Sequence, residues 1–523
     1  MLKTKLDNIN ADTSSIDDIM MDDALTGKIT LNGYDFYVDS NNNVLDYSGP
    51  VGTDTPEQSN TTAFSRANGR IDIVFLNGTG YSVTSTPNKP ALDNTMVPVY
   101  YDNTASAWKV CSDTDTTNWY NYYAADVSKA GLASDSENIQ SKWANVMLTD
   151  NIEVQKDGTP YDTAAIKTKL TENKLSDLVG ATVTTEGSML VWIPRYAYKI
   201  TYYSEPTKTT IIGYSDSRGF VDTDGKTPSH MEPPTTSINV NGTIGTTNYE
   251  YYRPHPAFET DLNQGGWGSK ITGIWVGKFE TTGTITDSKT EITTLSNTQA
   301  LTNQTIGTLW YSIKNNFKAG TKGSHMMKNS EWGAISYLAE SKFGRNEVEI
   351  TRNDKSGYYT GADNYKTNSN QSTTGNIYGI YDTVGGTYEY TASYIANSKE
   401  TNSYSYQFTS INPSTSKLND NAISSPYSTI YNYDNTNNTS DTNANNYAIN
   451  LNKVFGDGIC ETSISGNGTS SWYAAVSKFA NSSTPFFGRG GYINYSASGS
   501  FYFETAYGDP RSGIGSRVVC VVK

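Results

Sequence analysis

The sequence predicts a β-rich protein of the α+β class, and three observations support this. Apolar and polar residues alternate over residues 29–38 and again over 69–78, which is the period of a half-buried strand. The chain holds 39 tyrosines and 9 tryptophans, which favour strands and supply large amphipathic area for burial. Residues 329–339 instead repeat apolar positions at helical spacing. A protein built mainly of β-sheets with a few α-helices would show all three of these patterns.

Length and charge limit the classes of function. A chain of 523 residues is too long for one compact core, so we expect two or three modules. The net charge of −14 repels phosphate groups, so we expect no nucleic-acid partner. We also expect no signal peptide and no membrane insertion, because the longest aliphatic stretch is only residues 518–522.

The three cysteines are Cys111, Cys460 and Cys520, and they follow no metal-finger spacing. Their odd number argues against a disulfide scaffold. A bridge between Cys460 and Cys520 stays open at this point.

Residues 1–26 are predicted to form a short assembly helix. Intervals of 4, 3, 4, 3 and 4 residues, the spacing of a coiled-coil seam, separate Leu2, Leu6, Ile9, Thr13, Ile16 and Met20. An isolated helix of this length is marginal in water, so association with copies of itself, as a homotrimer, would stabilise it. A single amphipathic helix packed on its own domain is the alternative.

A small β module is expected at residues 27–90, with strands joined by tight turns rich in Asn and Gly. An aromatic-rich β module follows at residues 91–177. Its tryptophans, such as Trp108, favour core packing, although tryptophans also stack on carbohydrate. Its Trp-Tyr-Asn-Tyr and Lys-Trp-Ala-Asn segments, at 119–122 and 142–145, are similar to segments of Gram-positive bacterial and phage proteins. In those proteins they precede a domain like the formylglycine-generating enzyme.

Residues 178–523 carry ordered motifs of that same family. The segment 375–390 resembles the family element Asn-x-Tyr-Gly-x-Tyr-Asp-Met-x-Gly-x-x-Trp-Glu-Trp, with Tyr388 and Tyr390 in place of the tryptophans. The segment 515–519 resembles the family's Gly-Phe-Arg-Val-Val close, with Ser516 in place of Phe. The resemblance implies a C-type lectin-like domain of the sulfatase-modifying-factor variant over 178–523.

A polar insertion is expected inside this domain at residues 397–450. The tract consists mainly of Asn, Ser, Thr and Tyr and has almost no aliphatic residues. Such a composition buries little apolar area and need not be structured.

The family's oxidase chemistry is not expected here. The resemblance implies a copper-binding cysteine pair a few residues beyond an Arg-Gly-Gly motif. This chain has that motif at 489–491, but no cysteine follows before Cys520. Copper(I) prefers soft thiolate or thioether ligands, and one distant thiol cannot form a pair.

Other candidates for chemistry favour structural roles. The histidines are His230, His255 and His325, and the settings of the last two favour packing over ligation. Glu389 could act as a general acid, but we expect it to satisfy internal hydrogen bonds. A calcium site near Asp457 lacks the spacing of an EF-hand loop. We therefore expect no enzyme, no catalytic residue, no metal and no cofactor.

The segment from Arg489 to Arg517 is the predicted binding surface. It resembles the retroelement-diversified ends of some members of this fold family, in which fixed Gly and Phe residues alternate with variable polar ones. Tyr, Ser and Asn suit adaptable recognition surfaces. The residues expected to point outward and bind ligand are Tyr492, Asn494, Tyr495, Ser496, Ser498, Ser500, Tyr502, Tyr507, Asp509 and Arg511. A surface that only solvates the sheet is the alternative.

Two classes of function remain. The first is a non-catalytic receptor-binding adhesin of a phage tail or head fibre, exposed on the virion surface. Its partners would be a host-cell surface glycan or protein and other virion structural proteins. A bacterial surface or pilus-associated adhesin would display the same face. The second class is an enzyme, either a divergent formylglycine-type oxidase or a glycan-cleaving tail protein. We favour the binding protein, because neither the cysteine pair nor a defined carboxylate pair is present in the sequence.

Overall fold

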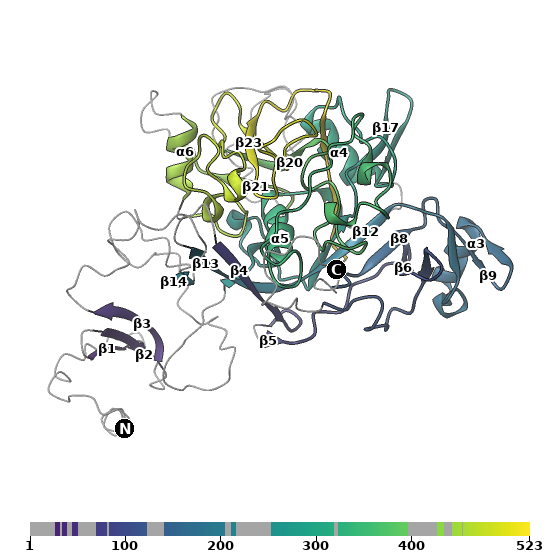
Figure 1. Cartoon of the computed structure of the whole chain (residues 1–523), viewed down its shortest axis with the longest axis horizontal. Coiled ribbons are helices and arrows are strands. Elements are labelled where there is room, and N and C mark those ends of the chain that lie inside the picture. The colour runs from purple at the N-terminus through teal and green to yellow at the C-terminus, as the bar shows by residue number, and fades with distance from the viewer. Residues whose placement is uncertain are drawn as a thin grey trace, which may run out of the picture. The chain divides into compact units, whose positions relative to one another are not determined.

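The chain divides into two compact units, residues 1–65 with 199–253 and residues 66–198 with 254–523. The structure is a computed structural model, shown in Figure 1. It describes residues 69–80, 83–122, 141–203, 253–317, 323–395, 426–433, 442–451 and 453–522, together with strands at 27–31, 34–38, 44–50 and 211–215. The predicted assembly helix at 1–26 lies outside the described residues.

The first unit contains a three-stranded antiparallel sheet. Its strands are β1 (Gly27–Leu31), β2 (Tyr34–Val38) and β3 (Val44–Pro50), in that order. Leu31 pairs with Tyr34, so two residues connect the first two strands, as a tight turn requires. This confirms the strands that the alternating pattern predicted here. A further strand of this unit is β14 (Ile211–Ser215).

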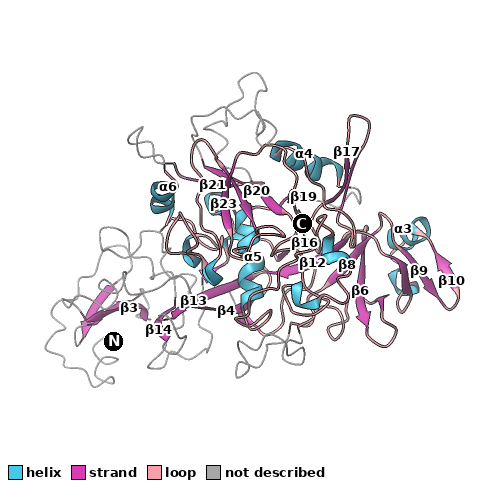
Figure 2. Cartoon of the chain, turned by 45° about the horizontal axis from the view of Figure 1, so that its top comes forward, coloured by secondary structure: helices cyan, strands magenta, loops and turns pink. Residues whose placement is uncertain are grey.

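The second unit is built on a ten-stranded sheet. Its order is β10-β9-β11-β7-β6-β8-β12-β16-β25-β19. The strands are β6 (Met96–Asp102), β7 (Ala107–Val110), β8 (Asn145–Leu148), β9 (Glu153–Lys156), β10 (Thr159–Tyr161), β11 (Thr182–Thr185), β12 (Met189–Pro194), β16 (Gly273–Gly277), β19 (Ser324–Met326) and β25 (Val518–Cys520). Figure 2 shows the unit as strands and long loops with short helices.

The expected module boundaries do not coincide with these units. Strands from 91–177 and from 178–523 share the ten-stranded sheet, so the expected boundary at 177/178 lies inside one unit. The expected 27–90 module is divided, because β4 (Gly69–Leu76) and β5 (Val83–Thr84) belong to the second unit. The tryptophans of 91–177 are buried, which confirms that they pack in a core.

A second, smaller sheet of this unit carries the predicted binding segment. Its strands are β20 (Tyr388–Ile395), β21 (Thr429–Tyr431), β22 (Phe486–Arg489), β23 (Phe503–Ala506) and β24 (Ile514–Ser516). Strand β20 pairs in parallel with β21 and β24 and antiparallel with β22, and β22 pairs with β23. The unit also contains the hairpin of β17 (Thr282–Ile285) and β18 (Thr290–Thr293), whereas β13 (Tyr196–Tyr203) and β15 (Arg253–Pro254) each include residues of both units.

Four α-helices lie within the described residues, namely α3 (Thr163–Thr171), α4 (Ile306–Asn316), α5 (Asn329–Glu340) and α6 (Asn443–Asn450). The predicted helix is α5, and its N-cap residue is Lys328. The Glu331 carboxylate accepts a hydrogen bond from the Lys328 amide at 2.9 Å, which closes the first turn. All of α5 is buried, because it contacts β4 and β20 as well as the 3-10 helix Pro256–Phe258. The described chain is thus β-rich α+β, as predicted.

The tract at 397–450 is structured where it is described. It supplies β21 and α6. Amides replace aliphatic packing here: Asn446 donates to the Ala480 carbonyl at 3.1 Å, and Asn450 donates to the Asn432 carbonyl at 2.8 Å. The expectation that this composition buries little is wrong for these residues, since Tyr431 and both asparagines are buried.

Candidate functional site

Arg489, at the end of β22, fixes the start of the binding segment. Its guanidinium is buried and donates to the carbonyls of Tyr502, Asp457 and Gly458 at 2.8–2.9 Å. The chain then turns through Gly490 and Gly491, both with φ near +80°. This region of φ favours glycine, so the turn requires these two residues.

The turn leads into a segment that we call the tyrosine loop, residues 490–500. The rings of Tyr492 and Tyr495 stack with their centroids 5.5 Å apart and their planes only 5° apart. Tyr492 is 39% exposed and Tyr495 is half-buried. The Ser498 hydroxyl accepts from the Tyr492 amide and donates to its carbonyl, at 3.1 and 3.2 Å. The loop backbone that carries the two rings is therefore held by hydrogen bonds within the loop.

A run of buried tyrosine rings, the tyrosine ladder, continues inward from this pair. Tyr502 meets Tyr495 and Tyr388 edge to face, with centroids 6.2 and 5.8 Å apart, and Tyr388 meets Tyr390 at 6.5 Å. Edge-to-face pairs favour one another electrostatically. The Tyr388 hydroxyl donates to the Glu504 carbonyl at 2.9 Å. The ladder therefore supports the partly exposed pair from below with buried, packed rings.

A second exposed group lies at the far end of the ladder. The Tyr390 hydroxyl donates to the Asp509 carbonyl at 2.8 Å. Beside it, the Arg511 guanidinium lies 5.4 Å from the ring centroid of Tyr507, which is 50% exposed. Arg511 also pairs with the Asp509 carboxylate at 2.9 Å, which raises the pKa of the guanidinium. The two exposed groups are thus linked through one set of packed rings.

Not all the predicted ligand-binding residues point outward. The exposed ones are Tyr492, Asn494, Ser496, Tyr507 and Arg511, and the half-buried ones are Tyr495, Ser498 and Asp509. The prediction is wrong for Ser500 and Tyr502, which are buried. Strand β23 begins only at Phe503, so the assumed alternation does not apply to the three residues before it. The Ser500 hydroxyl instead donates to Glu349 at 3.0 Å and the Tyr502 hydroxyl to Glu504 at 2.5 Å.

Two residues from another part of the chain support the tyrosine loop, and sequence reasoning missed both. Arg352 donates from Nη1 to the Tyr495 carbonyl at 2.8 Å, across 143 residues of sequence. Glu349 accepts the Ser500 hydrogen bond. No local pattern marks either residue, because their partners are set by the tertiary fold.

The candidate general acid Glu389 is paired inside the protein. Its carboxylate accepts from Nε and Nη2 of Arg517 at 3.1 and 2.5 Å, and both side chains are buried. Arg517 also interacts with the buried carboxyl groups of Glu280 and Asp382. Burial, Asp382 and Glu389 together hold the pKa of Glu280 well above its usual value. These contacts agree with the structural role that we expected for Glu389.

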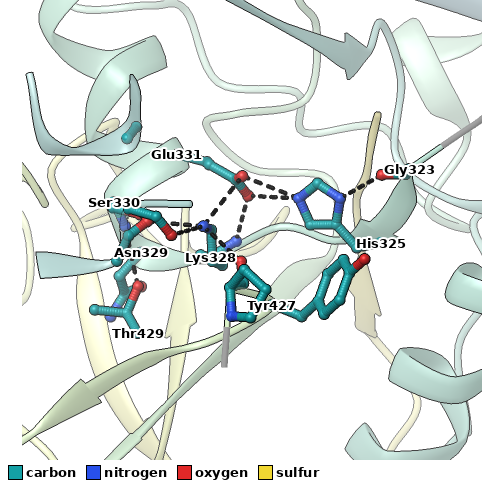
Figure 3. Close-up of polar contacts among 12 residues, drawn as sticks. Gly323, His325, Lys328, Asn329, Ser330, Glu331, Tyr427 and Thr429 are labelled. Carbon is teal, nitrogen blue, oxygen red and sulfur yellow. Dashed lines mark hydrogen bonds and ion pairs between the residues drawn. The ribbon is translucent and has the colours of Figure 1, made fainter. Parts of the chain in front are cut away.

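His325 also belongs to a buried network, which Figure 3 shows. Its Nε2 lies 2.9 Å from a Glu331 oxygen and its Nδ1 lies 2.8 Å from the Gly323 carbonyl. Lys328 lies 3.7 Å from the same carboxylate and donates to the Gly265 carbonyl at 2.7 Å. Burial lowers the pKa of Lys328 to about 8. The network joins the start of α5 to β19 and to the carbonyl of Gly265, so its geometry favours a structural role.

The remaining candidates are held by protein groups. Asp457 accepts hydrogen bonds from the Tyr431 hydroxyl and the Ile459 amide at 2.8 and 2.9 Å, and burial raises its pKa to about 6. Cys111, Cys460 and Cys520 are buried, and no disulfide joins Cys460 to Cys520. Among the described residues, no group of three His, Cys, Asp or Glu side chains could hold a metal ion. No helix in the described ranges is long and apolar enough to cross a membrane.

Comparison with protein-family models and with curated proteins finds no match to this chain.

Proposed function

We propose that the chain is a non-catalytic receptor-binding protein of a phage virion, which attaches to a host-cell surface ligand through the tyrosine loop and Tyr507. In this proposal, residues 178–523 form a C-type lectin-like domain, as the motifs at 375–390 and 515–519 suggest. The helix at 1–26 assembles three copies and joins them to other virion proteins.

The observation that carries the proposal is the stacked pair of Tyr492 and Tyr495 on a tied backbone. Tyrosine offers large amphipathic contact area and loses little side-chain entropy on binding. Exposed Asn494 and Ser496 flank the rings and offer uncharged hydrogen-bonding groups. A partly exposed aromatic pair backed by buried rings is the kind of anchor around which binding energy concentrates.

Two further observations favour binding over catalysis. The interval from Arg489 to Val519 has no cysteine to hold copper. The best carboxylate candidate, Glu389, is neutralised by Arg517 and is buried away from solvent. A general acid must reach its substrate, and this one does not lie at the surface.

Attachment to cells tests the proposal. The purified chain and a variant carrying Tyr492→Ala and Tyr495→Ala would be labelled and titrated onto a panel of Gram-positive bacteria. Each aromatic anchor contributes about 2 kcal/mol, so each substitution should weaken attachment roughly 30-fold. Tyr311→Ala removes a tyrosine of similar exposure from α4 and serves as the control. Equal attachment by the double variant and the wild type would show that the tyrosine loop is not the binding surface.

A further inference from the structure

The tyrosine loop rests on one acidic side chain from outside the binding segment, Glu349. Its Oε1 accepts from the Ile350 amide at 2.8 Å and from the Ser500 hydroxyl at 3.0 Å, with the Ser500 amide at 3.5 Å. Its Oε2 is buried and has no hydrogen-bond partner. A Cβ added at Gly499 would lie 3.1 Å from Oε2, so the loop backbone closes directly over the carboxyl group.

We propose that Glu349 is a positioning residue that makes the packing of the tyrosine loop, and hence ligand binding through Tyr492 and Tyr495, depend on pH. The inference about binding rests on the proposed function. The inference about packing does not.

The charged and titratable groups facing Glu349 come from three segments. Arg345 precedes it and donates from Nη2 to the Glu349 backbone carbonyl at 3.4 Å, while Nε and Nη1 of that guanidinium have no hydrogen-bond partner. Tyr473 approaches from the 3-10 helix Trp472–Ala474, and its hydroxyl donates to Glu340 of α5 at 2.8 Å. Glu347 and Glu340 add negative charge around Tyr473. The surroundings of Glu349 thus contain the cation Arg345 and the carboxyl groups of Glu340 and Glu347.

This setting favours a protonated carboxyl group. Burial raises the pKa of Glu349 to about 7, against the lowering effect of its hydrogen bonds and of Arg345. When the loop lifts and water reaches the carboxyl group, its pKa returns toward the ordinary value near 4.3. The closed loop therefore binds more protons than the open loop between these two pKa values. Closure is favoured at low pH and weakens as pH rises toward 7.

Hydrogen exchange of the full chain without ligand tests the packing directly. Protection factors, corrected for the intrinsic pH dependence of exchange, would be measured for peptides covering 490–500 between pH 4.5 and 8.5. In the wild type, protection should fall up to about tenfold per pH unit until pH 7 and then level off. In Glu349→Gln the profile should be flat, because the amide keeps the shape of the side chain and does not titrate. Peptides from β16 provide the reference for global opening.

Arg352→Ala is the matched control. It removes a different side-chain contact between the loop and a distant segment, at the Tyr495 carbonyl, and leaves the Glu349 carboxyl group in place. It should lower protection at every pH and keep the slope. Asp457, with a pKa of about 6, lies beside Arg489 at the other end of the loop. If Asp457 is the responsible group, Glu349→Gln will retain the slope, and the proposal is wrong.

A flat exchange profile in the wild type overturns the proposal by itself. The test therefore still decides if the Glu349→Gln variant fails to fold. Attachment to cells then separates the two proposals. In one outcome, the Tyr492→Ala, Tyr495→Ala variant loses attachment, while Glu349→Gln attaches with the same pH dependence as the wild type. This outcome would support the tyrosine loop as the binding surface and reject the role of Glu349. If the exchange profile slopes in the wild type and is flat in Glu349→Gln, but the chain attaches to no cells, the role of Glu349 in loop packing is supported and the proposed binding function is rejected.

Discussion

Arg517 and Glu389 form a buried, two-pronged ion pair that helps to join the smaller sheet built around β20 to the ten-stranded sheet. Glu389 lies on β20, and Arg517 lies between β24 and β25, 128 residues further along the chain. Arg517 also donates from Nη1 to the carbonyl of Gly277, the last residue of β16, at 2.9 Å. The guanidinium thus connects the smaller sheet, which carries the binding segment, to the ten-stranded sheet.

Removing this guanidinium should strongly destabilise the protein. Arg517→Met leaves the Glu389 carboxylate buried without its partner, which typically costs about 3–5 kcal/mol. Arg511→Ala breaks the ion pair of a half-exposed arginine with Asp509 and should cost less than about 1 kcal/mol. Urea unfolding followed by tryptophan fluorescence measures both. Similar free energies of unfolding for the two variants would contradict the structural role of the buried pair.

Tyr502 should matter for stability, in contrast to Tyr492. Truncating a fully buried aromatic residue leaves a cavity, so Tyr502→Ala should lower the free energy of unfolding by about 3–5 kcal/mol. Tyr492→Ala removes a partly exposed ring and should change it by no more than about 0.5 kcal/mol. Thermal unfolding of the two variants provides the comparison. A stable Tyr502→Ala variant would mean that the tyrosine ladder does not support the loop.

The sequence predicted local elements well where burial follows a simple period. Strand β4 shows the predicted alternation of buried and half-buried residues, and α5 lies where helical spacing placed it. The pattern failed at Ser500 and Tyr502, because they precede the strand and are oriented by Glu349 and Glu504. Alternation describes a strand, and a turn has no such period.

The sequence did not reveal which side chains interact across long distances along the chain. An internal role for Glu389 was expected, but nothing local identifies Arg517 as its partner. Arg352 was missed entirely, because its contact with the Tyr495 carbonyl depends on how distant segments fold together. The Asn-rich tract misled for a different reason: asparagine side chains fill buried positions there by bonding to backbone carbonyls.

The helix predicted at 1–26 should set the oligomeric state. Its seam would bury Leu6, Ile9, Ile16 and Met20 only when copies associate. We predict that the full chain is a trimer and that deletion of residues 1–26 yields monomers. Light scattering coupled to size-exclusion chromatography measures the mass of each. An unchanged mass after the deletion would show that another part of the chain drives assembly.

We predict that the chain neither binds copper(I) tightly nor oxidises a cysteine peptide to an aldehyde. No cysteine follows the Arg-Gly-Gly at 489–491 until Cys520, which is buried in β25. Burial holds the pKa of the Cys520 thiol well above its usual value, so it is a poor source of thiolate. Mass spectrometry of a peptide incubated with the chain and copper is the measurement. An aldehyde product would overturn the prediction.

The position of β25 has a consequence for the order of events during synthesis. This strand is inserted between β16 and β19, pairing Cys520 with both Trp275 and Ser324. Until a ribosome has made residues 518–520, those two neighbours have no strand between them, and exposed strand edges pair readily with other chains. Contacts between such distant segments also slow folding. A nascent or truncated chain that lacks residues 518–520 should therefore depend on chaperones, because its largest sheet forms only once β25 has been made.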